Sequence, residues 1–148
     1  DCGASSATGY KGASSATGYK GASSATGDYG ASSATGYKGA SSATGYRGAS
    51  SATGDYGASS ATGDCGASSA TGYCGASSAD NSTAVAVAWG YESKAKGCIG
   101  AHIVCAEWKY DNLNNDWVFV GAKMSIVDGV KIKADTYYTL RDGEFVEV

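Results

Sequence analysis

Small apolar and hydroxyl-bearing residues alternate through the first half of the chain in a pattern that returns every nine residues. The block Gly-Ala-Ser-Ser-Ala-Thr-Gly occurs eight times without change, first at residues 3–9 and last at residues 66–72. A ninth copy begins at Gly75 and breaks off at Asp80, and only the two residues after each block vary. A short fixed period of this kind predicts a solenoid, in which each unit buries its inner face by stacking on the next.

The alternation also predicts which side chains face inward. Successive residues of a strand point to opposite sides, so Ser5 and Ala7 share one face and Ser6 and Thr8 share the other. We expect Ser5 and Ala7 to face inward, because Ala is small and apolar, and the flanking glycines to form the corners. A disordered Gly/Ser linker has a similar composition. Eight unchanged copies with Tyr in a regular slot favour a folded array.

The charges in the variable pairs distinguish between two and three repeats per coil. Three repeats would stack Asp1, Asp28 and Asp55 as like charges about 4.8 Å apart, which is unfavourable. Two repeats give mixed columns and leave one clash, Lys20 over Lys38. The sequence therefore predicts an all-β fold, a flat β-solenoid of the β-roll type with two nonapeptides per coil.

Larger side chains enter after the array, which covers residues 1–79. Residues 80–97 continue the alternation as transitional coils, and residues 98–148 have the composition of a small β domain. We expect this domain to cap the roll, because an uncapped end would expose unpaired strand edges.

The cap sequence indicates strands separated by turn signals. Residues 99–110 and 117–127 are strand-like, and a loop is expected at residues 112–116. Asp128-Gly129 and Asp142-Gly143 are typical of hairpin turns, and they predict that residues 117–127 pair with 130–133 and that residues 137–140 pair with 144–148.

Composition and charge exclude several classes of protein. The chain has 23 Gly and no Pro, which excludes collagen. Acidic and basic residues cancel within the array, so the net charge of −3 arises after it. A neutral array argues against nucleic-acid binding, and no apolar run is long enough for membrane insertion. Because Asp1-Cys2 matches the variable pair Asp64-Cys65, we expect the chain to begin within a longer array.

Few residues have the chemistry of a catalytic or metal site. His102 is the only histidine, and on a strand Cys98 and His102 would face away from Cys105, which argues against zinc. The aspartates are too irregularly spaced for calcium-dependent repeats. In a two-repeat coil Cys65 and Cys74 lie on opposite edges and cannot form a disulfide. We therefore expect no enzymatic activity and no cofactor.

The segment after the array resembles a known family. Its strings Asn81-Ser82-Thr83-Ala84 and Ser93-Lys94-Ala95-Lys96-Gly97 are similar to the head repeats of YadA-like trimeric autotransporter adhesins, and the resemblance covers residues 3–97. It implies a left-handed β-roll that serves as a stalk or head on a cell or phage surface. We accordingly expect an extracellular, cell-surface or virion protein that acts as a structural stalk, fibre or adhesin-like scaffold and self-associates as a homotrimer or fibre.

Two other functions depend on the surface of the array. Outward hydroxyls would form a regular lattice suited to ice binding, with candidate residues Ser6, Thr8, Ser15, Thr17, Ser24, Thr26, Ser33 and Thr35. Aromatic columns would suit stacking against glycans of a host surface, with candidate residues Tyr10, Tyr19, Tyr37, Tyr46 and Tyr73.

Overall fold

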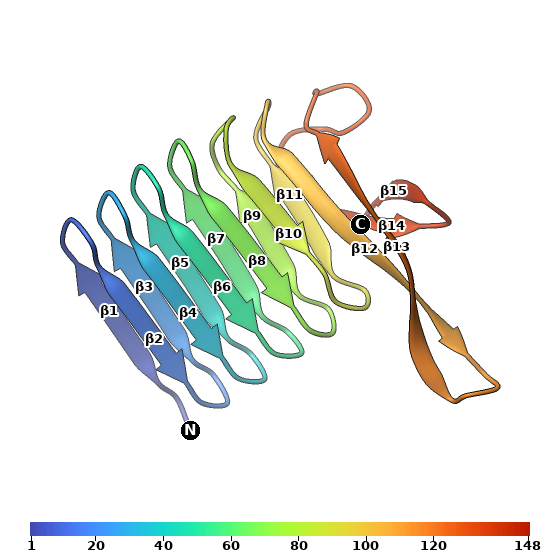
Figure 1. The fold of residues 1–148 in the computed structure, drawn as a ribbon, viewed down its shortest axis with the longest axis horizontal. Helices are drawn as coiled ribbons and strands as arrows, with labels where there is room; N and C mark the ends of the chain where they lie inside the picture. The colour runs from blue at the N-terminus through green and yellow to red at the C-terminus, as the bar shows by residue number, and fades with distance from the viewer.

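The computed structural model describes all 148 residues and consists of strands and turns without helices. The strands form two sheets that lie face to face (Figure 1). In order, the first sheet contains β1 (Ala4–Thr8), β3 (Ala22–Thr26), β5 (Ala40–Thr44), β7 (Ala58–Thr62), β9 (Ala76–Ala79), β11 (Lys94–Gly97), β14 (Tyr138–Arg141) and β15 (Glu144–Glu147). The second contains β2 (Ala13–Thr17), β4 (Ala31–Thr35), β6 (Ala49–Thr53), β8 (Ala67–Thr71), β10 (Val85–Ala88), β12 (His102–Asp111) and β13 (Asp116–Ile126).

Consecutive repeats alternate between the two sheets, so one coil contains two nonapeptides. Ala4 pairs with Ala22 in the first sheet and Ala13 with Ala31 in the second, an 18-residue step in each case. Every strand of the array pairs in parallel and in register with the equivalent strand of the next coil. The predicted β-solenoid with two repeats per coil is confirmed.

Burial follows the predicted alternation. In β2, Ser14 and Ala16 are buried, whereas Ala13, Ser15 and Thr17 are exposed. Serine can occupy half of the inward positions of each strand because its hydroxyl finds hydrogen-bond partners inside the roll.

The last glycine of each block has a positive φ, and in the coils beyond the first it also lies too close to the preceding coil for a side chain. Gly27 has φ of 150°, and a Cβ at this position would overlap the carbonyl oxygen of Gly9 in the preceding coil. The invariance of this glycine therefore has two causes, the positive φ at the corner and the close approach of stacked corners.

The cap continues both sheets beyond the array. β12 pairs in parallel with β10, and β13 returns antiparallel along β12. In the other sheet β14 pairs antiparallel with β11, and β15 completes a hairpin. Larger side chains fill the space between these strands in an apolar cluster that includes Ile103, Val127, Ile132, Tyr138 and Leu140. The cap thus closes the end of the roll by extending its core.

One predicted strand is wrong. Residues 130–133 form no strand, because one carboxylate oxygen of Asp128 accepts hydrogen bonds from the backbone N–H groups of Val130, Lys131 and Ile132. These bonds curl the segment into a compact loop, and the loop places Ile132 in the core. Local capping by Asp128 replaces the expected ladder.

The second predicted hairpin is confirmed. Asp142 and Gly143 have φ of 50° and 74°, as a type I′ turn requires, and they join β14 to β15. The loop expected at residues 112–116 is the turn between β12 and β13, with Asp116 already in β13. The chain contains no helix that could span a membrane.

Candidate functional surfaces

A continuous chain of serine hydroxyls runs through the interior of the array. The Ser14 hydroxyl donates to Ser5 over 2.9 Å, and Ser23 donates to Ser14 over the same distance. The pattern continues between residues nine apart as far as the contact of 2.8 Å between Ser68 and Ser77. The bonded residues are Ser5, Ser14, Ser23, Ser32, Ser41, Ser50, Ser59, Ser68 and Ser77. Because successive members belong to opposite sheets, the chain fastens the two sheets together.

The chain of serine hydroxyls explains how so polar an interior is stable. Each hydroxyl within the chain donates once and accepts once, and no buried side-chain polar atom lacks a partner. Aligned O–H groups polarise one another, which strengthens the individual bonds. The sequence predicts that these serines face inward but not that they bond to one another, because the bonding depends on the distance between the sheets.

The predicted hydroxyl lattice is divided between two opposite faces of the roll. Ser6 and Thr8 align with Ser24 and Thr26 on the outer face of the first sheet. On the second sheet, Ser15, Thr17, Ser33 and Thr35 form the equivalent rows. An outward alanine accompanies each pair, as Ala4 does in β1, so each face carries parallel rows of methyl and hydroxyl groups.

Tyrosines at the turns after the even-numbered strands form a continuous aromatic column along one edge. The ring centroids of Tyr19 and Tyr37 are 5.1 Å apart, those of Tyr37 and Tyr56 are 5.3 Å apart, and those of Tyr56 and Tyr73 are 5.7 Å apart. Tyr91 extends the column to the cap. Its ring centroid lies 5.0 Å from that of Tyr73 and 3.3 Å from that of Trp117 in the cap. The column therefore joins the array to the cap.

The opposite edge has one pair of aromatic rings instead of a continuous column. Tyr10 lies 5.3 Å from Tyr29, and the Arg47 guanidinium lies 5.6 Å from the rings of Tyr29 and Tyr46. The five tyrosines predicted to form columns are thus divided, with Tyr10 and Tyr46 on this edge and the other three opposite.

The prediction missed Tyr29 and Tyr56, which follow Asp instead of preceding Lys. Both nevertheless contact tyrosines of neighbouring coils. Tyr29 and Tyr56 are the second residue of their variable pair, whereas Tyr10 and Tyr37 are the first. The rings of the two positions nevertheless meet across adjacent coils. The reversed Asp-Tyr order could have indicated this contact.

Lys38, which the two-repeat coil stacks over Lys20, lies beside two aromatic rings. The Lys38 ammonium lies 5.9 Å from the Tyr37 ring and 5.7 Å from the Tyr56 ring. A cation over a ring face is attracted by the negative potential of that face. The tyrosines of this edge thus contact Lys38 as well as one another.

The two tyrosines of the column nearest the cap have raised pKa values. The pKa of Tyr73 is raised to about 12 by its hydrogen bond with Cys74 and by the nearby charges of Cys74 and Glu92. Desolvation and the Glu92 carboxylate raise the pKa of Tyr91 as well. Both shifts move the ionisation of these phenols further above physiological pH.

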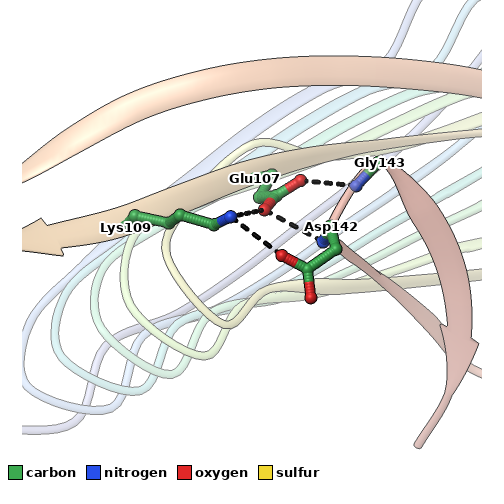
Figure 2. A network of polar contacts seen from close by, with 4 residues as sticks. All are labelled: Glu107, Lys109, Asp142 and Gly143. Carbon is green, nitrogen blue, oxygen red and sulfur yellow. Dashed lines mark hydrogen bonds and ion pairs between the residues drawn. The ribbon is translucent and has the colours of Figure 1, made fainter.

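A polar network fixes the β14–β15 turn to β12 (Figure 2). Glu107 is only 5% exposed, and its carboxylate accepts hydrogen bonds from the backbone N–H groups of Asp142 at 3.0 Å and Gly143 at 2.8 Å. Lys109 lies 3.4 Å from Glu107 and 2.8 Å from Asp142. The Gly143 N–H in particular lowers the pKa of Glu107. A carboxylate whose anion is stabilised in this way is an anchor for the turn and a poor proton donor.

The cysteines and the histidine are not gathered into a metal site. No group of three or more His, Cys, Asp or Glu side chains is placed to hold a metal ion. Cys105 is buried, which raises the pKa of its thiol to about 12, whereas His102 is partly exposed. All five cysteines are free, and Cys65 and Cys74 lie in turns on opposite edges, as predicted.

Comparison with known proteins gives no relative for this arrangement. No family model matches the chain, and no curated protein or solved structure is significantly similar to it.

Proposed function

We propose that this chain is a non-enzymatic structural scaffold, a rigid stalk or spacer that holds its cap at a fixed distance and orientation. The observation that carries the proposal is the unbroken serine chain from Ser5 to Ser77, which ties the two sheets together in every coil of the array.

Two further sets of bonds restrict bending between coils. The sheets pair in register at all five positions of each strand from β1 to β8, as in β3 and β5, and at four positions between β7 and β9. The turns bond as well, with the Tyr29 N–H donating to the Tyr10 carbonyl at 3.0 Å and the Tyr56 N–H donating to the Tyr37 carbonyl at 2.9 Å. Sheets, corners and interior are therefore all bonded from coil to coil, and no hinge interrupts the array.

The finer features of the proposal rest on the sequence. The neutral array and the resemblance to trimeric adhesin heads support display on a cell surface or virion, with self-association and contact with host glycans. The non-enzymatic assignment is supported by the single histidine and by the full hydrogen bonding of Glu107, the one buried carboxylate.

Rigidity can be tested by measuring distances between spin labels. Cys2 and Cys65 are exposed, and replacing Cys74 and Cys98 by Ser leaves Cys105 as the only other thiol, which is buried and unreactive at neutral pH. A rigid stalk gives a narrow distance distribution. A duplicated coil inserted at residues 30–47 should lengthen the distance by about 4.8 Å. A broad distribution of the distance between the labels, or a distance that the insertion does not change, would refute the proposal that the array is a rigid spacer.

Ice binding is a second candidate, favoured by the in-register rows of hydroxyl and methyl groups on both faces. Replacing Thr26 and Thr44 by Tyr roughens the face of the first sheet, and replacing Thr17 and Thr35 roughens the second. If one face binds ice, only its own pair of substitutions should abolish thermal hysteresis. Absence of hysteresis in the unmodified chain would eliminate this function.

A further inference from the structure

Five aromatic rings line one hollow where the array meets the cap. The hollow has a volume of about 700 Å³, and its other lining residues are Thr71 and two corner glycines, Gly72 and Gly90. The rings belong to Tyr73, Trp89, Tyr91, Trp108 and Trp117. All three tryptophans of the chain are thus present, and none of them belongs to the apolar cluster that fills the cap. Filling the core therefore does not account for these residues.

The hairpin of β12 and β13 forms one wall of the hollow. β10 ends at Ala88, opposite Cys105, whereas β12 continues to Asp111 before the chain turns into β13. The hairpin therefore extends past the coils (Figure 1), and it brings Trp108 and Trp117 to the turns that carry the other three rings.

The rings are held in place without a ligand. The Trp108 indole N–H donates a hydrogen bond of 2.8 Å to the Trp89 carbonyl. The Tyr73 and Tyr91 rings stack with their centroids 5.0 Å apart, and Trp117 packs against Tyr91. Tyr73, Trp89 and Trp117 nevertheless remain 37%, 41% and 36% exposed. The hollow thus presents fixed and accessible rings, which reduces the entropy lost on binding.

The lining is poorly suited to a ligand that needs many hydrogen bonds. Thr71 is the only lining residue with a polar side chain outside the rings, and its hydroxyl already donates to Thr53. The indole N–H of Trp108 is also engaged. A sugar seated among the rings would find few partners for its hydroxyl groups, which weakens binding. The rings instead suit a cation with an apolar surface, because the face of an aromatic ring attracts positive charge.

The charges beside the hollow also favour a cation. Glu92 follows Tyr91 in the same turn, forms no ion pair, and accepts only a weak bond of 3.7 Å from the Cys74 thiol. The adjoining hollow shares three of the rings and contains three carboxylates and two basic groups, namely Glu92, Glu107, Asp142, Lys109 and Arg141. Its one lysine is already paired with two of these carboxylates (Figure 2). A free carboxylate therefore lies next to the rings.

We propose that this hollow is an aromatic cage that binds a trimethylammonium group, the head of choline. Such a group carries its charge beneath methyl groups, so that it can contact several rings and be attracted by each. A bare ammonium is strongly hydrated, and the cage offers few groups to replace its water. The site goes beyond the stalk role, which does not depend on it.

Tryptophan fluorescence can measure binding in the full chain, because every tryptophan lines the cage. Choline should change the emission saturably, with a Kd of about 1 mM or below. Dimethylbutanol, the neutral analogue of choline in which carbon replaces nitrogen, should bind about fivefold or more weakly. Equal affinity for the two compounds would overturn the proposal. Tighter binding of a methyl glucoside, or no saturation by choline up to about 10 mM, would do the same.

Two column tyrosines provide a matched pair of variants. Tyr73→Leu removes a ring of the cage and should weaken choline binding about threefold to thirtyfold. Tyr19→Leu removes a ring that stacks on Tyr37 outside the cage, and it should leave the affinity unchanged. Thermal unfolding shows whether both variants fold.

Glu92→Gln tests the charge without removing a ring. It should weaken the binding of choline about twofold to fivefold and leave that of dimethylbutanol unchanged. Choline affinity that survives in full in both Tyr73→Leu and Glu92→Gln would overturn the proposal.

Vesicles distinguish the two sources of the group. Binding to phosphatidylcholine vesicles that choline competes away would show that the cage takes the headgroup of a lipid. Binding of choline without binding to these vesicles would show that it takes the free compound. Both results support the cage.

Discussion

The hydroxyl of Ser32 donates a hydrogen bond of 3.0 Å to the hydroxyl of Ser23, although the two residues lie in different sheets of the roll. The bond crosses the space that side chains such as Leu or Val fill in most β proteins. Its repetition makes the two sheets one mechanical unit, with a core so thin that Ser and Ala suffice to fill it.

Breaking the serine chain should destabilise the roll. In Ser41→Ala, the Ser50 hydroxyl loses its acceptor and the Ser32 hydroxyl loses its donor. Buried groups left without partners cost about 1–3 kcal/mol of unfolding free energy. The matched variant Ser42→Ala removes an outward hydroxyl from the same strand and should change stability by less than about 0.5 kcal/mol. Equal losses of unfolding free energy for the two variants in urea would show that the serine hydrogen bonds contribute nothing to stability.

The tyrosine column should contribute to stability through Tyr56. This ring contacts Tyr37 and Tyr73, and each aromatic pair contributes about 0.5–1.5 kcal/mol beyond burial. Tyr56→Ala should therefore lower the thermal midpoint clearly. Tyr46→Ala is the control, since the Tyr46 ring pairs with no other aromatic ring and lies 5.6 Å from the Arg47 guanidinium, and its effect should be smaller. Unchanged stability together with lost glycan binding in Tyr56→Ala would instead assign the column to recognition.

Two corner glycines distinguish the cost of backbone strain at positive φ from the cost of steric overlap with the preceding coil. Gly9 and Gly45 have φ of 142° and 144°, but a Cβ on Gly9 meets no atom within 4 Å, whereas one on Gly45 would overlap the Gly27 carbonyl. Gly9→Ala should cost about 1–3 kcal/mol through backbone strain alone. Gly45→Ala should cost more, because stacked corners must also separate. Equal losses in chemical unfolding would contradict the contribution of close stacking.

Acid should destabilise the cap through Glu107. Its pKa is lower in the folded chain than in an unfolded one, so its stabilisation is present above about pH 4.3 and is lost as the pH falls through the lower folded value. The pKa values of Asp128 and Asp142 are also lowered and act in the same direction.

Glu107→Gln separates this contribution from the others. The variant should have a lower thermal midpoint than the unmodified chain at pH 7. The amide of Gln keeps one acceptor oxygen, and its NH₂ group cannot accept the second backbone N–H bond that the carboxylate receives from Asp142 and Gly143. Its midpoint should also fall less between pH 7 and pH 3. Parallel pH curves for the two proteins would contradict the role given to this carboxylate.

The repeat itself determined most of the array. The invariant block fixes the period, the alternation of Ser5, Ser6, Ala7 and Thr8 fixes the faces, and the charges of the variable pairs select two repeats per coil. These features are local or recur at a fixed spacing, so stacking carries them unchanged from one coil to the next.

Only the tertiary structure decided how parts distant in sequence or in different sheets meet. The distance between the sheets decided that inward serines bond to one another, and the diagonal reach of Tyr56 decided that the column is continuous. Asp128 bonded three backbone groups and so prevented a strand at residues 130–133, a competition that the hairpin pattern could not resolve. The end of the second sheet left β13 open, because whether an apolar strand is covered depends on everything packed around it and not on its own sequence.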